Sequence, residues 1–228
     1  GGMSEFFTHP ANMLYPAPPD MPWELIPLAE PLTIALHGLH RLKAASGEHV
    51  AIFGAGPIGL LAAMCTLHYG AVPILIDVVS QRLDAARALG VRETIHLAAV
   101  SGPNGLESRV REITGGRMCE CVFEASGAGA AIRSSLDIAS HAGRIALIGW
   151  PKDDTALPTD VITRKELDVR GARNSANEFA EALELIASGR ADVRAILTKT
   201  VPLEDAARAL MDIERRPGDF LKVNVVLP

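Results

Sequence analysis

The feature that most constrains this chain is a strand, turn, helix and strand pattern between residues 50 and 77. An apolar run at residues 50–53 leads into a turn with the spacing G-x-G-x-x-G. A second apolar stretch, residues 58–64, has the character of a buried helix, and a third, residues 72–76, ends at Asp77. This order of elements predicts a βαβ unit of the kind that binds a dinucleotide.

The glycines of the turn have separate physical roles. Gly54 permits the tight turn, Gly56 has no Cβ and lets a pyrophosphate approach the backbone, and Gly59 allows the helix to pack closely on the strand. The free N–H groups and positive end of the helix favour phosphate at the same place. The residues predicted to bind the pyrophosphate are Gly54, Gly56, Pro57, Ile58 and Gly59.

Asp77 lies 18 residues after Gly59, at the tip of the second predicted strand. A carboxylate there accepts hydrogen bonds from a ribose diol. It also repels a 2′-phosphate, because both groups are negative. The sequence therefore predicts NAD in preference to NADP.

Composition excludes several classes of protein. The chain has 228 residues, 48% of them hydrophobic, and a formal net charge of −5, which indicates a large core and argues against a nucleic-acid surface. No apolar run is long enough to cross a membrane, and no secretory signal opens the chain. Its three cysteines form no disulfide framework, so we expect a cytoplasmic protein.

Strands and helices continue to alternate after Asp77, which predicts an α/β fold with a doubly wound, six-stranded parallel sheet. The further strands are expected at residues 93–97, 119–125, 143–149 and 167–171. The helices between them are expected at residues 80–89, 106–113 and 130–140. A helix, strand, helix and strand are expected to follow at residues 178–188, 195–201, 203–215 and 221–227.

Five short segments carry a resemblance to a known family. Besides the glycine turn, they are G-G-M-S-E-F at residues 1–6, A-E-P-L at 29–32, F-E-A-S-G at 123–127 and G-A-R-N-S at 171–175. Together they resemble the medium-chain dehydrogenase/reductases, and within them the zinc-dependent polyol, threonine and sugar-acid branch. The resemblance covers essentially the whole chain.

The resemblance implies a division into three parts. Residues 1–28 would end a GroES-like catalytic domain, residues 29–172 would form the NAD-binding Rossmann domain, and residues 173–228 would return to the catalytic domain. In this family a Cys and a His-Glu pair in the N-terminal third hold the catalytic zinc, and a four-cysteine zinc lobe follows. Neither is found here, so we expect this chain to lack the N-terminal catalytic third and zinc to be bound by the full-length protein.

Glu30 is the strongest catalytic candidate. The resemblance implies that the Glu of the E-P-L segment lies beside the zinc, as a direct ligand or through water. The alternative is an ordinary carboxylate at the start of a helix, where the helix dipole favours negative charge.

The resemblance also assigns residues to the cofactor and the substrate, and four of them have a purely structural alternative. Arg82 would lie near the adenosine, Ala125 and Ser126 on the adenine side, and Arg173 and Asn174 near the substrate or a cofactor phosphate. The three residues expected beside the nicotinamide are Ile148, Gly149 and Trp150. Lys222 could reach the cofactor or the cleft. The alternatives are a solvated helix charge for Arg82, a core or interface aromatic for Trp150, and an interdomain pair for Arg173 and Asn174.

Together these features predict an NAD-dependent, zinc-type dehydrogenase that oxidises a secondary alcohol of a polyol, sugar acid or hydroxy amino acid to a ketone. This chain would carry mainly the cofactor-binding part. The alternatives are a zinc-free NADPH-dependent quinone or enoyl reductase of the same superfamily, and a non-catalytic dinucleotide-binding module. The expected partners are a small alcohol or ketone and a second copy of the chain, in a homodimer or homotetramer, because an uncovered sheet edge favours association.

Overall fold

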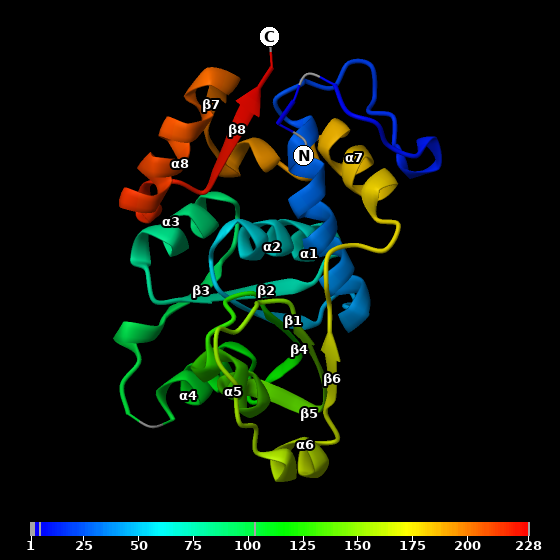
Figure 1. The fold of residues 1–228 in the computed structure, drawn as a ribbon. Coiled ribbons are helices and arrows are strands. Elements are labelled where there is room, and N and C mark those ends of the chain that lie inside the picture. The colour runs from blue at the N-terminus through cyan, green and yellow to red at the C-terminus, as the bar shows by residue number, and fades with distance from the viewer. Residues whose placement is uncertain (1–2, 5, 103, 228) are drawn as a thin grey trace. The chain divides into compact units, whose positions relative to one another are not determined.

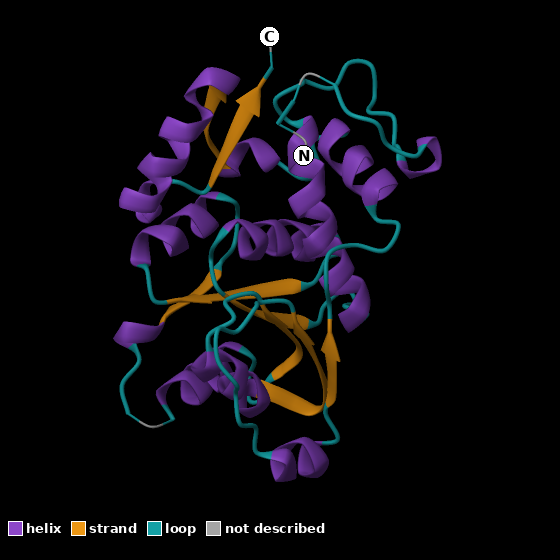
Figure 2. Ribbon diagram, viewed as in Figure 1, coloured by secondary structure: helices purple, strands orange, loops and turns teal. Residues whose placement is uncertain are grey.

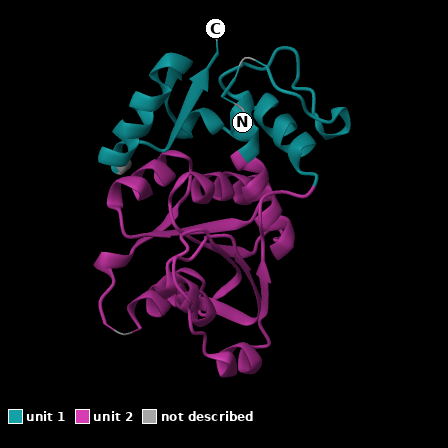
Figure 3. Ribbon diagram, in the orientation of Figure 1, with its two compact units in different colours: residues 1–30, 177–228 teal, residues 31–176 magenta. Residues whose placement is uncertain are grey.

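The computed structural model describes residues 3–4, 6–102 and 104–227, and it consists of two compact units (Figure 3). One unit is Pro31–Ala176, and the other combines Gly1–Glu30 with Asn177–Pro228. The segment G-G-M-S-E-F lies partly outside the described residues, because residues 1, 2 and 5 are not among them.

The larger unit is built on a six-stranded parallel sheet in the order β3-β2-β1-β4-β5-β6 (Figures 1 and 2). Its strands are β1 His49–Phe53, β2 Val72–Asp77, β3 Glu93–His96, β4 Cys119–Glu124, β5 Ala139–Leu147 and β6 Asp168–Gly171. The first strand, β1, lies in the middle of the sheet. Strands β2 and β3 follow outward to one edge, and β4, β5 and β6 follow outward from β1 to the other edge. This confirms the predicted doubly wound α/β fold and places β1 and β4 at the point where the strand order reverses.

Helices cover both faces of this sheet. In Figure 1, α2 and α3 lie on one face and α4, α5 and α6 on the other. The bounds are α1 Ala29–Leu42, α2 Pro57–His68, α3 Ser80–Ala88, α4 Gly105–Ile113, α5 Gly129–Ile138 and α6 Thr159–Lys165. Every residue of β1 is buried, as expected for a central strand of a parallel sheet that is covered on both sides.

The smaller unit contains α7 Phe179–Ala187, α8 Ala206–Arg215 and a parallel pair of strands, β7 Leu197–Pro202 and β8 Lys222–Val226. Segments from both ends of the sequence bond to each other within it. The side-chain amide of Asn224 donates to the backbone carbonyl of Glu24 at 2.5 Å, and the rings of Tyr15 and Phe179 stack with their centroids 5.3 Å apart. The remaining short turns of the chain are 3-10 helices at Ala11–Met13, Ile26–Leu28, Leu97–Ala99, Val193–Ile196, Leu203–Asp205 and Pro217–Asp219.

Two elements differ from the sequence-based expectation. Strand β5 begins at Ala139 rather than near residue 143, because the strand takes in a bulge opposite Cys119 and Cys121 in which Ala142 has a φ of 55°. Helix α6, for which the sequence provides no long apolar stripe, is a seven-residue helix without a buried residue. Neither feature leaves a periodic hydrophobic signal, since a bulge depends on the strand with which it pairs, and α6 packs only the partly buried Val161 and Ile162 against the core.

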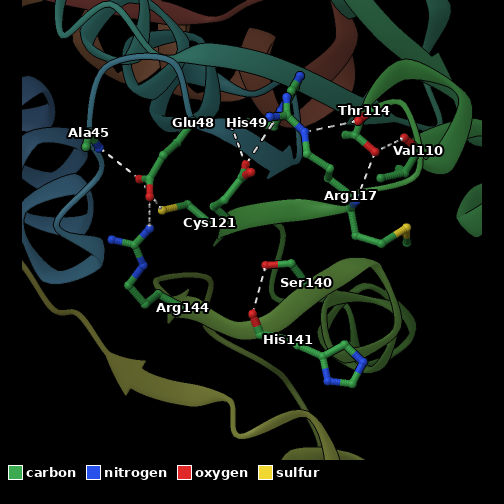
Figure 4. Close-up of polar contacts among 12 residues, drawn as sticks. Ala45, Glu48, His49, Val110, Thr114, Arg117, Cys121, Ser140, His141 and Arg144 are labelled. Carbon is green, nitrogen blue, oxygen red and sulfur yellow. Dashed lines mark hydrogen bonds and ion pairs between the residues drawn. The ribbon is translucent and has the colours of Figure 1, made fainter.

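A cluster of polar contacts stabilises the amino-terminal end of the sheet (Figure 4). Glu48, just before β1, accepts from the backbone N–H of Ala45 at 2.9 Å and forms an ion pair with Arg144 of β5. The Cys121 thiol lies 3.6 Å from the same carboxylate. Among the residues described, no helix has the length and apolar character needed to cross a membrane.

The three cysteines provide a test of the packing. Cys65, Cys119 and Cys121 are buried, and burial raises the pKa of the Cys119 thiol to about 12 and that of the Cys121 thiol to about 12. Because only thiolates react readily, we expect no thiol of the folded chain to react with a disulfide reagent at pH 8 within minutes, and all three to react in denaturant. Rapid modification of the folded chain would show that this core is open.

Candidate dinucleotide-binding site

The turn between β1 and α2 is held by close backbone packing. Gly54 has a φ of +94° and donates its N–H to the carbonyl of Ile76 at 2.8 Å. A Cβ at position 59 would overlap the carbonyl oxygen of Gly54, so any larger residue would push α2 away from β1. Both positions therefore need glycine, one for its backbone conformation and the other for the close approach.

The space in front of Gly56 is open, in contrast to that at Gly59. Gly56 is the N-cap of α2, and among the described residues no atom outside its own stretch of chain lies within 4 Å of the position that its Cβ would take. Pro57 has no N–H to leave unsatisfied at the first helical position, and the N–H groups of Ile58 and Gly59 fall in the first turn, where a helix lacks internal acceptors. The residues here fit a pyrophosphate, which needs open space and N–H donors at a helix end.

Asp77 ends β2 and is held against this turn. One of its carboxylate oxygens accepts from the backbone N–H of Ala55 at 2.6 Å, and the other accepts from that of Val79 at 2.8 Å. The side chain is nearly buried, and each oxygen has a second lone-pair direction that neither bond uses. The carboxylate is therefore fixed beside the glycine turn, with capacity to accept further hydrogen bonds.

The surroundings of Asp77 include a residue that the sequence did not indicate. His96 is opposite Asp77 in the register of β2 and β3, and its Nε2 lies 2.9 Å from the carbonyl oxygen of Val78. Arg82 is half-buried in the first turn of α3, and its backbone N–H donates to Val79 at 3.2 Å. His96 belongs to no recognisable motif in the sequence, and its contact with Val78 follows only from the pairing of β3 with β2.

The ends of β4 and β5 are joined through Glu124, the last residue of β4. Its carboxylate is completely buried and accepts hydrogen bonds from the backbone N–H groups of Ser126 and Gly127 and from the Ser126 hydroxyl. Its backbone carbonyl accepts from Ile148 and Gly149, both at 2.9 Å. The sequence contained a signal for it, since Glu124 is an acid at the end of an otherwise apolar strand.

A cavity of about 440 Å³ lies between the loops that follow β4 and β5. It is lined by Ser126, Gly127, Ala128, Gly129, Trp150, Pro151, Lys152, Asp153, Asp154 and Thr155. Trp150 is 75% exposed, and the guanidinium carbon of Arg173 lies 5.3 Å from its ring centroid, a cation–π distance. Asn174 follows with a φ of 51°, a left-handed conformation that Asn tolerates better than most residues.

The structure thus brings most of the predicted cofactor residues to the carboxyl ends of neighbouring strands in one unit. They are Gly54, Gly56, Pro57, Ile58, Gly59, Asp77, Arg82, Ala125, Ser126, Ile148, Gly149 and Trp150, and Arg173 and Asn174 belong to the same unit. Glu30, exposed in the first turn of α1, and Lys222, the first residue of β8, belong to the other unit.

The described residues do not fit a zinc site of their own. In residues 3–4, 6–102 and 104–227, no group of three or more His, Cys, Asp or Glu side chains is arranged to hold a metal ion. Cys119 and Cys121 are instead buried parts of β4. The chemistry that can be derived from these residues is that of binding and orienting a dinucleotide.

Comparison with known families matches residues 57–188 to the model described as zinc-binding dehydrogenase. The matched region begins at the first residue of α2 and ends just after α7. It therefore includes Asp77, Glu124 and both loops that line the cavity.

Individual proteins match over most of this chain. An uncharacterized zinc-type alcohol dehydrogenase-like protein of Haemophilus influenzae is 47% identical over 226 residues, which are 99% of this chain and 65% of that protein. A D-xylulose reductase of Saccharomyces cerevisiae is 26% identical over 230 residues, 100% of this chain and 65% of that protein. The chain thus spans slightly less than two thirds of the length of these relatives.

A solved structure, the galactitol-1-phosphate dehydrogenase of Escherichia coli, superposes with a TM-score of 0.80 at 29% identity. The match covers 89% of this chain and 60% of that one.

The two glycines give a matched pair of variants. We expect Gly59→Ala to destabilise the chain by about 1–3 kcal/mol, because its methyl group would overlap the Gly54 carbonyl. We expect Gly56→Ala to destabilise the chain by less, at most about 1 kcal/mol, because its methyl group meets open space and alanine is only the poorer N-cap residue. Urea unfolding of both variants measures the difference, and equal losses would contradict the packing described here.

Proposed function

Because this chain belongs to the zinc-binding dehydrogenase family, we propose that it binds NAD, and that the whole protein oxidises a secondary alcohol of a polyol, sugar acid or hydroxy amino acid to a ketone. The observation that carries the cofactor assignment is Asp77, held by two backbone N–H groups beside the open end of α2. The names of two relatives, a D-xylulose reductase and a galactitol-1-phosphate dehydrogenase, support the polyol class.

The preference for NAD over NADP rests on the fixed position of Asp77. A ribose diol can donate two hydrogen bonds to a carboxylate, whereas a 2′-phosphate can only bring negative charge against it. Because both oxygens of Asp77 are bonded to the backbone, the side chain cannot turn away without losing those bonds. The nearby Arg82 lies in α3 and is a candidate contact of the adenosine half.

The other residues of this unit would orient the cofactor. The nicotinamide, when bound, supplies the hydride acceptor. The N–H groups at the start of α2 would hold the pyrophosphate, and Ala125 and Ser126 would lie on the adenine side. Backbone groups of Ile148 and Gly149 would anchor the carboxamide, with Trp150 beside the ring. These roles give the transferred hydride a fixed starting geometry, which is the protein's share of such a reaction.

We assign Glu30, Arg173 and Asn174 to the alcohol-binding side of the proposed reaction. Glu30 would act beside the zinc, directly or through water, and Arg173 and Asn174 would contact the substrate or a cofactor phosphate. Lys222 would reach the cofactor or the cleft. The zinc itself would be held mainly by residues other than those described here.

The proposed assembly is a homodimer or homotetramer. Strand β6 forms one edge of the sheet, where it pairs only with β5 among the strands described. An open edge presents unpaired backbone groups that a second copy of the chain can satisfy.

A titration with the two reduced cofactors tests the NAD assignment. We expect the chain to bind NADH at least tenfold more tightly than NADPH, measured by nicotinamide fluorescence. Asp77→Asn should weaken NADH binding by roughly tenfold or more, since a hydrogen bond to a charged group contributes about 1.5–3 kcal/mol, and should reduce the preference over NADPH.

The matched control for that variant is Asp84→Asn. It makes the same change of charge on an exposed residue of α3 that pairs with Arg87. The control should bind both cofactors as the wild type does. Equal affinity of the wild type for NADH and NADPH would contradict the assignment of Asp77 to the ribose.

The proposed activity is tested on the whole protein. We expect NADH to form from NAD in the presence of a polyol or sugar acid, and we expect a zinc chelator to abolish this. Glu30→Gln should lower kcat by at least tenfold while NADH binding remains, because Glu30 is assigned to the alcohol side. A well-folded whole protein that holds no zinc would exclude the zinc mechanism but not the cofactor site.

A further inference from the structure

The buried carboxylate of Glu124 is the feature that the proposed function does not use. We propose that Glu124 is a positioning residue, which holds the loop after β4 and the end of β5 in one arrangement and thereby sets the shape of the dinucleotide site. The inference rests on the proposed function for its cofactor part. Its structural part, the joining of the two loops, can be tested without any cofactor.

The negative charge of the Glu124 side chain is balanced by hydrogen-bond donors of the loop that follows β4. One oxygen accepts from Ser126 N–H at 2.9 Å and from Gly127 N–H at 3.1 Å, and the other lies 3.2 Å from the same Gly127 nitrogen. The Ser126 hydroxyl adds a further short bond. Among the described residues no Lys, Arg or His forms an ion pair with this carboxylate, so the donors of the loop after β4 compensate its burial.

The backbone of Glu124 is also hydrogen-bonded to the residues that directly follow β5. The carbonyl of Glu124 accepts from Ile148 N–H and from Gly149 N–H, both at 2.9 Å. One residue therefore has its side chain on the loop after β4 and its main chain on the end of β5. A change in the rotamer or charge of Glu124 would affect both.

The loop after β4 and the end of β5 also pack against each other. A Cβ at Gly149 would overlap the backbone nitrogen of Gly127, and a Cβ at Gly127, whose φ is +68°, would lie 2.6 Å from the carbonyl oxygen of Trp150. The two backbones thus lie in direct contact, and the Glu124 carboxylate is packed beside them, 2.7 Å from the position that a Gly149 Cβ would take. Movement of one segment must be accommodated by the other.

Glu124 is not placed to contact a bound cofactor directly. Its side chain is completely buried, whereas Ser126, Gly127 and Trp150 line the cavity of about 440 Å³. Glu124 therefore acts on that cavity through residues that it holds. Strands β2 and β4 flank β1, and each ends in an acidic residue that holds the neighbouring turn, Asp77 on β2 and Glu124 on β4. Asp77 differs in that its side chain remains slightly accessible to solvent.

The test is Glu124→Gln, which keeps the size of the side chain but places an amide group where only acceptors fit. We expect backbone hydrogen exchange, measured without cofactor, to accelerate by at least tenfold at Ser126 and Gly127 and also at Ile148 and Gly149. We expect the Kd for NADH to rise by at least tenfold at a temperature where the variant is fully folded.

The control is Glu48→Gln, at the opposite end of the strands (Figure 4). Like Glu124, Glu48 is a carboxylate that accepts from a backbone N–H, but it is only partly buried and precedes β1, whereas Glu124 is completely buried and ends the parallel strand β4. Glu48→Gln should lower Tm without changing exchange at residues 126–127 and 148–149 or the affinity for NADH. A purely structural role of Glu124 would make the two variants alike.

Each outcome decides a defined part of the proposal. Faster exchange at residues 126–127 alone, with residues 148–149 unchanged, would overturn the joining of the two loops. Unchanged NADH affinity in folded Glu124→Gln would overturn its positioning role. If the wild type binds neither NADH nor NADPH, the proposed function fails, and exchange alone decides whether Glu124 joins the loops. Should Glu124→Gln not fold, Ser126→Ala removes one donor and should accelerate exchange in both segments by a smaller factor.

Discussion

The close contact between the start of α2 and the end of β1 is the constraint on which the rest of the site depends. Gly59 lies against the Gly54 carbonyl, so the helix begins directly above the central strand. This placement leaves the first N–H groups of α2 beside the carboxyl ends of the strands. In a parallel sheet these ends all lie along the same edge. A displaced helix would separate the phosphate donors from Asp77, which bonds to the same turn through Ala55.

Two acidic residues extend this arrangement on either side of β1. Asp77 ends β2 and Glu124 ends β4, the two neighbours of β1 in the sheet. Both accept backbone N–H groups of the turns beside them, and neither forms an ion pair among the residues described. Buried carboxylates of this kind satisfy the donors of sharp turns that no regular element can satisfy. They thereby fix loops that would otherwise be mobile.

Much of the fold could be predicted because its strands are short, apolar and separated by helices. The sequence predicts the central strands β1, β2 and β4 to within a residue or so, and it predicts six strands in a parallel, doubly wound sheet. It does not predict the early start of β5 or the helix α6. The bulge in β5 depends on its pairing with β4, and α6 buries none of its seven residues, so neither has a periodic signal in the sequence.

The βαβ unit, its glycine turn and the carboxylate of Asp77 can be recognised in the amino-acid sequence alone, because they depend on local spacing and on backbone conformations that few residues adopt. Which loops meet depends on how the strands are arranged in the folded sheet. The contact of Gly127 with Gly149, the two-sided bonding of Glu124 and the stacking of Arg173 on Trp150 join residues that are distant in sequence. Such contacts arise from the order in which parallel strands are laid side by side, and local periodicity contains no record of that order.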